Sequence, residues 1–135
     1  MSGTNSGPAG PAGGGIWAAP TLDTKRGAVY VATGNGYADP PQPMTNAVVA
    51  MDLQTGAVKW VRQTTPNDSW TLGCQPKNPG NPACPETLGP DYDFSASPSL
   101  TTVNGRDLLV LPQKSGIAWA IDPDPLARFG AVVFQ

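Results

Sequence analysis

The chain is 135 residues long and carries 16 Gly and 16 Pro, so its regular elements must be short and its turns numerous. Only 13% of the residues are charged and the net charge is −2, which excludes an electrostatic basis for binding nucleic acid or an anionic membrane surface. There is no histidine and no apolar run of the roughly 20 residues that a membrane helix needs, which excludes Ser-His or Cys-His nucleophiles, histidine-ligated metal sites and a spanning helix.

The first segment, MSGTNSGPAGPAGGG at residues 1–15, is rich in Gly, Pro and Ser. It has neither the basic start nor the apolar stretch of a secretory signal peptide. We expect residues 1–15 to be a flexible segment and residues 16–135 to form the folded domain, with a cysteine-flanked insertion at 66–90.

The remainder of the chain shows the two-residue apolar alternation of β-strands. Turn sequences such as TKRG, QTG, VNGR and KSG separate the candidate strands. No apolar pattern keeps helical spacing over three turns, so the sequence predicts an all-β antiparallel meander. The candidate strands are GAVYVATG (27–34), NAVVAMDL (46–53), AVKWVRQ (57–63), RDLLVLPQ (106–113) and IAWAID (117–122).

Two cysteines, Cys74 and Cys84, flank the loop CQPKNPGNPAC. Two thiols cannot supply the four thiolate ligands of an all-cysteine zinc site. A disulfide that closes this loop is favoured over free thiols, and it would indicate an oxidising compartment.

The string AMDLQTGAVKW at residues 50–60 combines a small residue, an acid, a Thr-Gly turn and a tryptophan. Ala120 and Asp122 repeat its start, and residues 130–134 repeat its end with Phe in place of Trp. Without the proline-rich insertion, the period approaches the roughly 40–50 residues of propeller blades, each a four-stranded sheet. Two unrelated hairpins with similar turns are the alternative. The defining positions of the string are Ala50, Asp52, Gly56 and Trp60.

This string resembles the tryptophan-docking motif of the quinoprotein alcohol dehydrogenases, eight-bladed β-propellers that use pyrroloquinoline quinone (PQQ) and calcium. In that family the motif fastens one blade to the next and is structural. Further stretches resemble the family in its order along the chain, and the cysteine-bearing insertion is most similar to the polyvinyl-alcohol dehydrogenase branch. The resemblance implies about two blades of such a propeller. The matching stretches are GGGIW (13–17), VYVATGNG (29–36), DYDFSASPSL (91–100) and LPQKSGIAWAID (111–122).

The resemblance implies one functional residue in each of these stretches. Trp17 would lie flat against PQQ, which suits the large apolar face of its ring. Asn35 would bind calcium through its side-chain oxygen, since Ca²⁺ prefers oxygen ligands. Asp91 would be the base that removes the hydroxyl proton as hydride leaves the alcohol. Lys114 would contact the quinone oxygens and stabilise the charge that develops on them.

Each of these positions has a second interpretation. Trp17 could pack against the entry of a strand, and Asn35 could serve only the Asn-Gly turn. Lys114 could be the solvated tip of a turn. Asp93 lies two residues after Asp91, so either could be the base, or both could be solvated turn acids.

A departure from the family pattern affects the assignment of the base. In many members a tryptophan stands directly before the catalytic aspartate, whereas here residues 71–90 separate Trp70 from Asp91. Asp91 takes that role only if the intervening segment is an insertion.

The resemblance implies a periplasmic enzyme that oxidises secondary or polymeric alcohols by hydride transfer to PQQ and passes electrons to a c-type cytochrome. The family's calcium-binding glutamate and most cofactor contacts have no counterpart in 135 residues. We therefore expect a fragment or truncated relative that is inactive alone and whose exposed blade faces favour self-association. The alternatives are a non-catalytic propeller scaffold and a self-associating β module without a small-molecule ligand.

Overall fold

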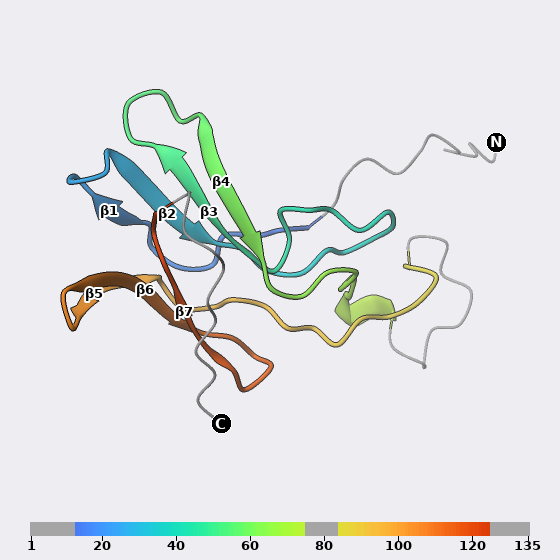
Figure 1. The fold of residues 1–135 in the computed structure, drawn as a ribbon. Coiled ribbons are helices and arrows are strands. Elements are labelled where there is room, and N and C mark those ends of the chain that lie inside the picture. The colour runs from blue at the N-terminus through green and yellow to red at the C-terminus, as the bar shows by residue number, and fades with distance from the viewer. Residues whose placement is uncertain (1–12, 75–83, 125–135) are drawn as a thin grey trace.

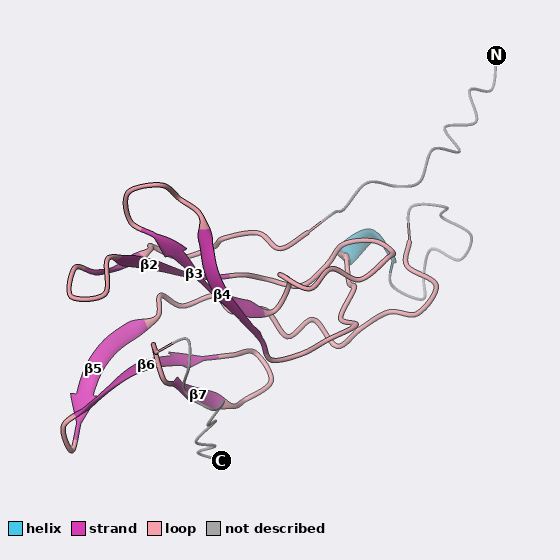
Figure 2. Cartoon of the chain, turned by 45° about the horizontal axis from the view of Figure 1, so that its top comes forward, coloured by secondary structure: helices cyan, strands magenta, loops and turns pink. Residues whose placement is uncertain are grey.

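Strands form where apolar residues alternate between turn sequences, and they assemble into two antiparallel sheets. The structure is a computed structural model that describes residues 13–74 and 84–124. Every strand pairs with a neighbour in sequence, so the predicted all-β antiparallel meander is confirmed (Figures 1 and 2). The first sheet runs in the order β1 (Thr21–Asp23), β2 (Ala28–Ala32), β3 (Ala47–Asp52) and β4 (Val58–Gln63). The second runs in the order β5 (Ser99–Val103), β6 (Arg106–Pro112) and β7 (Ala118–Ile121).

All the strands predicted from alternation are present, as β2, β3, β4, β6 and β7. Alternation did not predict β1 or β5. The first is only three residues long, and four of the five residues of β5 are exposed. An exposed edge strand needs no apolar face, so its sequence lacks the alternating signal.

The two sheets form separate layers that face each other across one apolar core (Figure 1). Tyr30 and Trp60 enter it from the first sheet, and Leu109 and Ile121 enter it from the second. Phe94, on the segment that leads into β5, is buried in the same cluster. This core holds the sheets in a fixed relation and therefore also aligns the loops at their ends.

The spacing of the string 50–60 has a geometric explanation. Ala50 lies opposite Tyr30 on one side and Trp60 on the other, and the two aromatic ring centroids are 5.7 Å apart. A small residue between them lets both rings reach the core. The indole N–H of Trp60 donates to the carbonyl of Pro123, 3.2 Å away and just beyond β7, so Trp60 contacts both layers.

The β3–β4 turn explains the remaining positions of the string. The Asp52 carboxylate accepts hydrogen bonds from the backbone N–H groups of Gln54 and Thr55 and from the Thr55 hydroxyl. Gly56 follows with φ of 72°, a left-handed conformation that favours glycine. The acid and the Thr-Gly pair thus form the turn that aligns Trp60 with Ala50.

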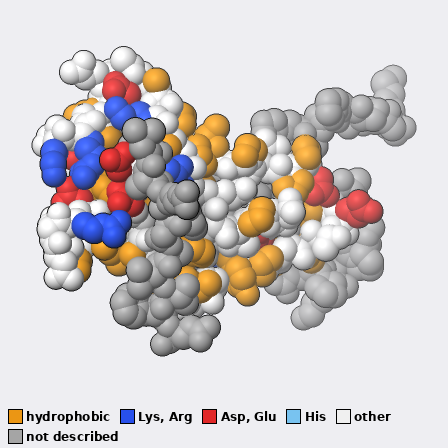
Figure 3. Space-filling view, viewed as in Figure 1, with side chains coloured by type: hydrophobic (Ala, Val, Ile, Leu, Met, Phe, Trp, Pro, Cys, Tyr) orange, Lys and Arg blue, Asp and Glu red, His pale blue; other side chains and the backbone are white. Residues whose placement is uncertain are grey.

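One end of the sheet pair carries a group that we call the turn-end ion cluster, made of Asp23, Lys25, Arg26, Tyr30 and Asp107. The Arg26 guanidinium lies 2.9 Å from the Asp23 carboxylate and 2.8 Å from that of Asp107 on β6. Lys25 pairs with Asp107, and the Tyr30 hydroxyl donates to Asp23. Basic and acidic side chains gather over this end, on the left of Figure 3.

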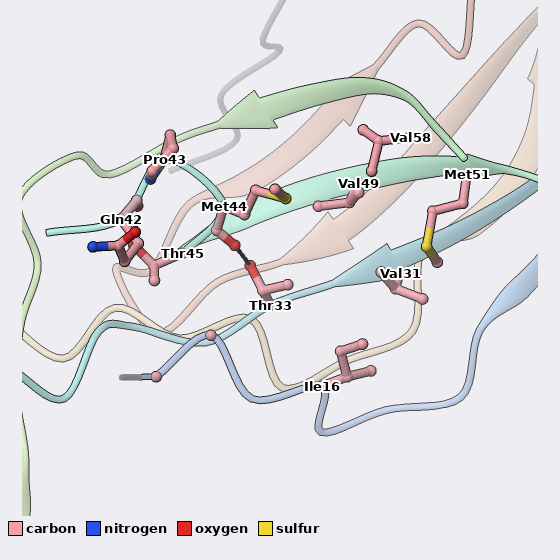
Figure 4. A pocket seen from close by; sticks show the side chains of 12 residues that line it. Ile16, Val31, Thr33, Gln42, Pro43, Met44, Thr45, Val49, Met51 and Val58 are labelled. Carbon is pink, nitrogen blue, oxygen red and sulfur yellow. Dashed lines mark hydrogen bonds between the residues drawn. The ribbon is translucent and has the colours of Figure 1, made fainter. Parts of the chain in front are cut away.

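The outer face of the first sheet is apolar as well. Val31, Ala47 and Val49 are buried there, and a groove of about 430 Å³ passes over Val31, Val49 and Met51 toward Met44 (Figure 4). The Thr33 hydroxyl donates to the Met44 carbonyl at the side of this groove.

Two sequence predictions lie largely or wholly outside the described residues. These are the flexible segment 1–15, of which residues 1–12 are not described, and the end of the second copy of the string at 130–134, whose start at Ala120 and Asp122 is described. In the described part of the chain, no helix is long and apolar enough to cross a membrane.

Candidate functional site

Four segments that are distant in the sequence meet at the end of the sheets opposite the turn-end ion cluster. Residues 13–15 pair with the loop after β2, through Gly34 N–H to Gly15 O and Gly14 N–H to Asn35 O, both 2.8 Å. The segment 91–94 binds the same loop, because Asn35 N–H donates to the Asp93 carboxylate at 2.6 Å. The turn after β6 joins through Lys114 N–H to Asp93 O at 3.1 Å. The four resemblance stretches therefore converge.

The centre of this site is a lysine between two carboxylates. Lys114 Nζ lies 2.6 Å from Asp93 Oδ2 and 3.2 Å from each carboxylate oxygen of Asp91. The Asp93 side chain is almost fully buried, whereas that of Asp91 is 25% exposed. Asp93 is thus held on both oxygens, by Asn35 N–H and by Lys114, and Asp91 is the more accessible carboxylate.

The electrostatics of the three groups differ accordingly. Burial raises the pKa of Asp91 above its usual value, and Lys114 opposes that shift while the charge on Asp93 adds to it. The hydrogen bond to Asp93 raises the pKa of Lys114, so the lysine stays charged at neutral pH. Two acids that share one cation leave Asp91 incompletely compensated.

Asn35 is buried in the loop after β2, and the hydrogen bonds that its side-chain nitrogen donates fix the orientation of the amide group. That nitrogen donates to the carbonyls of Gly36 and Trp70, the latter at 2.6 Å. Both amide hydrogens are used, which fixes the direction of the side-chain oxygen.

The described residues fit the two cofactors of the resemblance unequally. Trp17 presents a large exposed ring, 61% accessible, next to Gly34. A Cβ on Gly34 would lie 2.6 Å from the Trp17 indole nitrogen and 2.5 Å from the Asp93 carboxylate, so the ring borders the charged centre. This suits a flat, anionic quinone. Among the described residues, no group of three or more Asp, Glu or Cys side chains is placed to hold a metal ion together.

The glycines of the stretch 13–17 are explained by close backbone approach. A Cβ on Gly13 would lie 2.6 Å from the Asn35 carbonyl oxygen, and Gly13 has φ of 108°. A Cβ on Gly15 would lie 3.2 Å from the Tyr37 hydroxyl. Side chains here would push the Trp17 segment away from the loop that carries Asn35.

Sequence reasoning missed several residues that build this site. Gln113 is buried, and its amide nitrogen donates to the hydroxyls of Thr64 and Thr65 after β4. It thereby ties the turn that carries Lys114 to the first sheet. Asp68 is fully buried and binds the backbone of residues 91–92. Asp68 lies in no periodic pattern, and Gln113 is only the last residue of the predicted strand 106–113, so contacts alone identify their roles.

The segment between Trp70 and Asp91 forms a loop whose two ends lie side by side. Gly89 N–H donates to Ser69 O at 2.9 Å, so the two ends of the excursion are bonded to each other. η1 (Leu72–Cys74) begins it, and Cys74 forms the predicted disulfide with Cys84, with Cα atoms 5.4 Å apart. This geometry is that of a closed loop beside the site.

Comparisons with known proteins agree with the predicted fold. The family model for the glucose/ethanol/alcohol dehydrogenase β-propeller domain, designated PQQ, matches residues 3–77. Polyvinylalcohol dehydrogenase of a Pseudomonas species is 48% identical over 116 residues, 85% of this chain and 18% of the relative. The same enzyme of Sphingopyxis sp. (strain 113P3) is 39% identical over 127 residues, 93% of this chain and 19% of the relative. The chain therefore spans about a fifth of the length of the curated relatives it matches.

A solved structure extends the comparison to three dimensions. The quinohemoprotein alcohol dehydrogenase of Comamonas testosteroni superposes with a TM-score of 0.62 at 24% identity, over 92% of this chain and 18% of the other. At that identity the similarity establishes the fold. The prediction of a partial β-propeller is confirmed, and the two sheets are successive blades.

Proposed function

Because the chain belongs to the β-propeller domain family of the PQQ-dependent glucose, ethanol and alcohol dehydrogenases, we propose that it supplies part of the active site of an enzyme that oxidises secondary or polymeric alcohols. The observation that carries this proposal is the position of Lys114 between Asp91 and Asp93, beside the exposed ring of Trp17. Its relatives named polyvinylalcohol dehydrogenase support a polymeric alcohol.

PQQ, when bound, supplies the quinone that accepts hydride from the alcohol. The exposed face of Trp17 provides a flat apolar wall for its rings. Lys114 is a fixed cation close to that wall, and it stabilises negative charge on quinone oxygens. Asn35 contributes one oriented amide oxygen to calcium in the longer protein, which supplies the other ligands.

Asp91 is the proposed base. Its raised pKa makes it a better proton acceptor than an ordinary carboxylate, once it is ionised. Its 25% exposure leaves room for a hydroxyl group to approach. Asp93 is the alternative base, but its oxygens already accept hydrogen bonds from Asn35 and Lys114, so we assign it the role of orienting the lysine.

Trp60 has a proposed structural role as the docking residue between blades. It is buried in the core that both sheets share and bonds to Pro123 beyond β7. Ala50, Asp52 and Gly56 set its position through the pairing and the turn described above.

For the longer protein we propose a periplasmic location and a c-type cytochrome as electron acceptor. The Cys74–Cys84 disulfide supports an oxidising compartment. We expect the 135-residue chain to be inactive alone, because it spans only about a fifth of the length of the relatives it matches. A self-associating β module is a second candidate, favoured by the apolar groove on the outer face of the first sheet.

The proposed function is tested by titrating the chain with PQQ in excess calcium and following tryptophan fluorescence. We expect saturable quenching that is lost in Trp17→Ala and weakened by a chelator. Leu72→Ala is the matched control, because Leu72 is also an exposed apolar residue but lies on the insertion. Equal quenching in Trp17→Ala would contradict the assignment of Trp17. A folded chain without quenching would restrict PQQ binding to the longer protein.

The size of the chain in solution separates the second candidate from the first. A β module that associates through the outer groove gives a dimer or larger species that Val49→Asp dissociates, since Val49 lies under that groove. A chain that stays monomeric would exclude this candidate.

A further inference from the structure

Asp68 is a buried carboxylate in the loop after β4 that the mechanism above does not use. One oxygen, Oδ1, accepts the backbone N–H of Asp91 at 3.1 Å. The other, Oδ2, accepts the backbone N–H of Tyr92 at 2.8 Å and the Asn46 side-chain amide at 2.8 Å. The Asp68 side chain is fully buried, and two of these three bonds hold the segment 91–94 of the candidate site.

The backbone around Asp68 is unusually constrained. Four described residues other than glycine have positive φ, and three of them are Asp91 at 63°, Asn67 at 58° and Asn46 at 46°. These are Asp68's preceding neighbour and two of its hydrogen-bond donors. Such conformations persist where surrounding contacts hold them, and they concentrate at functional sites.

Gly89 shows how closely the returning chain packs on this carboxylate. A Cβ at Gly89 would lie 2.2 Å from Asp68 Oδ1 and 2.8 Å from Asp68 Cα. Only glycine lets the chain pass here and reach Asp91 two residues later. The end of the cysteine-flanked excursion is therefore fitted to Asp68.

We propose that Asp68 is a positioning residue, whose carboxylate holds the backbone of residues 91–92 so that the Asp91 side chain stays against Lys114. A carboxylate suits this task because it offers several acceptor positions to converging N–H groups and donates none when ionised. Asp93 does not need this support, because Asn35 N–H and Lys114 hold it directly. The inference rests on the proposed function, in which Asp91 is the base.

The test compares Asp68→Asn with Asp23→Asn in the 135-residue chain. Both aspartates are buried and each accepts three hydrogen bonds, but Asp23 lies in the turn-end ion cluster. NMR hydrogen exchange would follow the amides of Asp91 and Tyr92, and a carboxyl ¹³C titration would follow the pKa of Asp91. These measurements require neither PQQ nor turnover, so the proposed function and the positioning role can fail separately.

Asp68→Asn turns one of the two accepting oxygens into an NH2 group, so at least one of the Asp91 and Tyr92 amides loses its acceptor. We expect that amide to exchange about tenfold faster, the effect of losing one hydrogen bond. The pKa of Asp91 should fall toward its ordinary value as the side chain leaves its buried position, while that of Lys114 stays raised because Asp93 remains its partner. Asp23→Asn should leave all of these unchanged.

Gly89→Ala provides a second variant that keeps the charge of Asp68. Its methyl group would meet both the Asp68 carboxylate and the backbone of Asp68 and Ser69, so these groups must move apart, and the same changes at Asp91 are expected without the loss of a neighbouring charge. This variant also decides the question if Asp68→Asn does not fold. Unchanged Asp91 behaviour in Gly89→Ala, or equal changes in Asp23→Asn, would overturn the proposal.

Discussion

The two ends of the sheet pair both carry charged clusters that join one blade to the other, yet the clusters are balanced differently. The turn-end ion cluster has two carboxylates, Asp23 and Asp107, and two cations, Lys25 and Arg26. The candidate site also has two carboxylates, Asp91 and Asp93, but only Lys114 lies between them. With one cation fewer, the negative charges of Asp91 and Asp93 are less fully compensated than those of Asp23 and Asp107.

The pKa values of these acids follow the difference in balance. Burial would raise the pKa of Asp23, but hydrogen bonds from Arg26 and Tyr30 outweigh it and hold the pKa below its usual value. Hydrogen bonds from Lys25, Thr102 and Arg26 lower the pKa of Asp107. Burial raises the pKa of Asp91 instead. In the balanced cluster the pKa values of both acids are lowered, whereas in the unbalanced one the pKa of Asp91 is raised.

The largest effect is expected in the apolar core that lies between the two charged clusters. This prediction tests whether packing in that core contributes more to holding the two blades together than either charged cluster does. Trp60→Ala should lower the free energy of unfolding by about 3–5 kcal/mol, because it leaves a cavity in the shared core. Urea unfolding measures this. Trp17→Ala, at an exposed ring, should change it by less than about 0.5 kcal/mol. Similar losses in both variants would contradict the central role of Trp60.

The second prediction concerns the balanced cluster. Asp23→Asn should cost about 3 kcal/mol at neutral pH, since it breaks a buried pair and leaves Arg26 with Asp107 alone. The pKa of Asp23 is lowered in the folded state, so its contribution is present above the unfolded-state pKa and is lost as pH falls through the folded-state pKa. Unfolding measured across acidic pH should show wild type and variant converging.

A matched control for that prediction is Asp122→Asn, which removes an ion pair to the largely exposed Arg106. It should change stability by less than about 1 kcal/mol. A loss as large as that of Asp23→Asn would mean that burial does not distinguish the turn-end ion cluster from ordinary surface pairs.

The third prediction tests whether the candidate site depends on the nearby disulfide. Replacing both Cys74 and Cys84 by Ala should lower the free energy of unfolding by about 2 kcal/mol, because the open loop gains entropy when unfolded. The pKa of Asp91 should not change, since Gly89 and Asp91 are anchored to Ser69 and Asp68 independently. A changed pKa of Asp91 in this variant would show that the disulfide also affects the structure of the candidate site.

The smallest effect should have the opposite sign. Asp91→Asn should raise the free energy of unfolding at neutral pH by less than about 1 kcal/mol, because it removes an incompletely compensated charge. The pKa of Asp91 is raised in the folded state, so wild type loses stability as pH rises from the unfolded-state pKa through the folded-state value, and the variant does not. Asp93→Asn should destabilise the chain instead, since Lys114 loses a charged partner and one of the two donors, Asn35 N–H or Lys114, loses its acceptor. If Asp91→Asn destabilised the chain, the difference in charge balance between the turn-end ion cluster and the candidate site would be contradicted.

Much of the fold could be predicted from local patterns. The alternation in residues 27–34, 46–53 and 57–63 predicted β2, β3 and β4, because successive side chains of a strand point to opposite faces. The strand β5 could not be found in this way, since Leu100 is its only residue that packs against the core and the other four are exposed. The spacing in residues 50–60 predicted that these positions act together in the structure. The pairing of Ala50 with Tyr30 on one side and Trp60 on the other explains that spacing.

The candidate site was only partly predictable. Resemblance pointed to Trp17, Asn35, Asp91 and Lys114 one stretch at a time, and the structure brings those stretches together. Their roles stay predictions. No pattern indicated Asp68, and the pattern that included Gln113 gave it no role, because a single polar residue carries no periodic signal of its contacts.

The sequence alone determined five of the seven described strands, the turns between them and the string at residues 50–60, since these depend on neighbours a few residues apart. Tertiary structure alone decided that one lysine is shared by two acids and that a buried aspartate, Asp68, supports the more exposed of them. The physical reason is that charge balance and burial depend on which distant loops meet when the two sheets pack, and that alignment is set by the core between them.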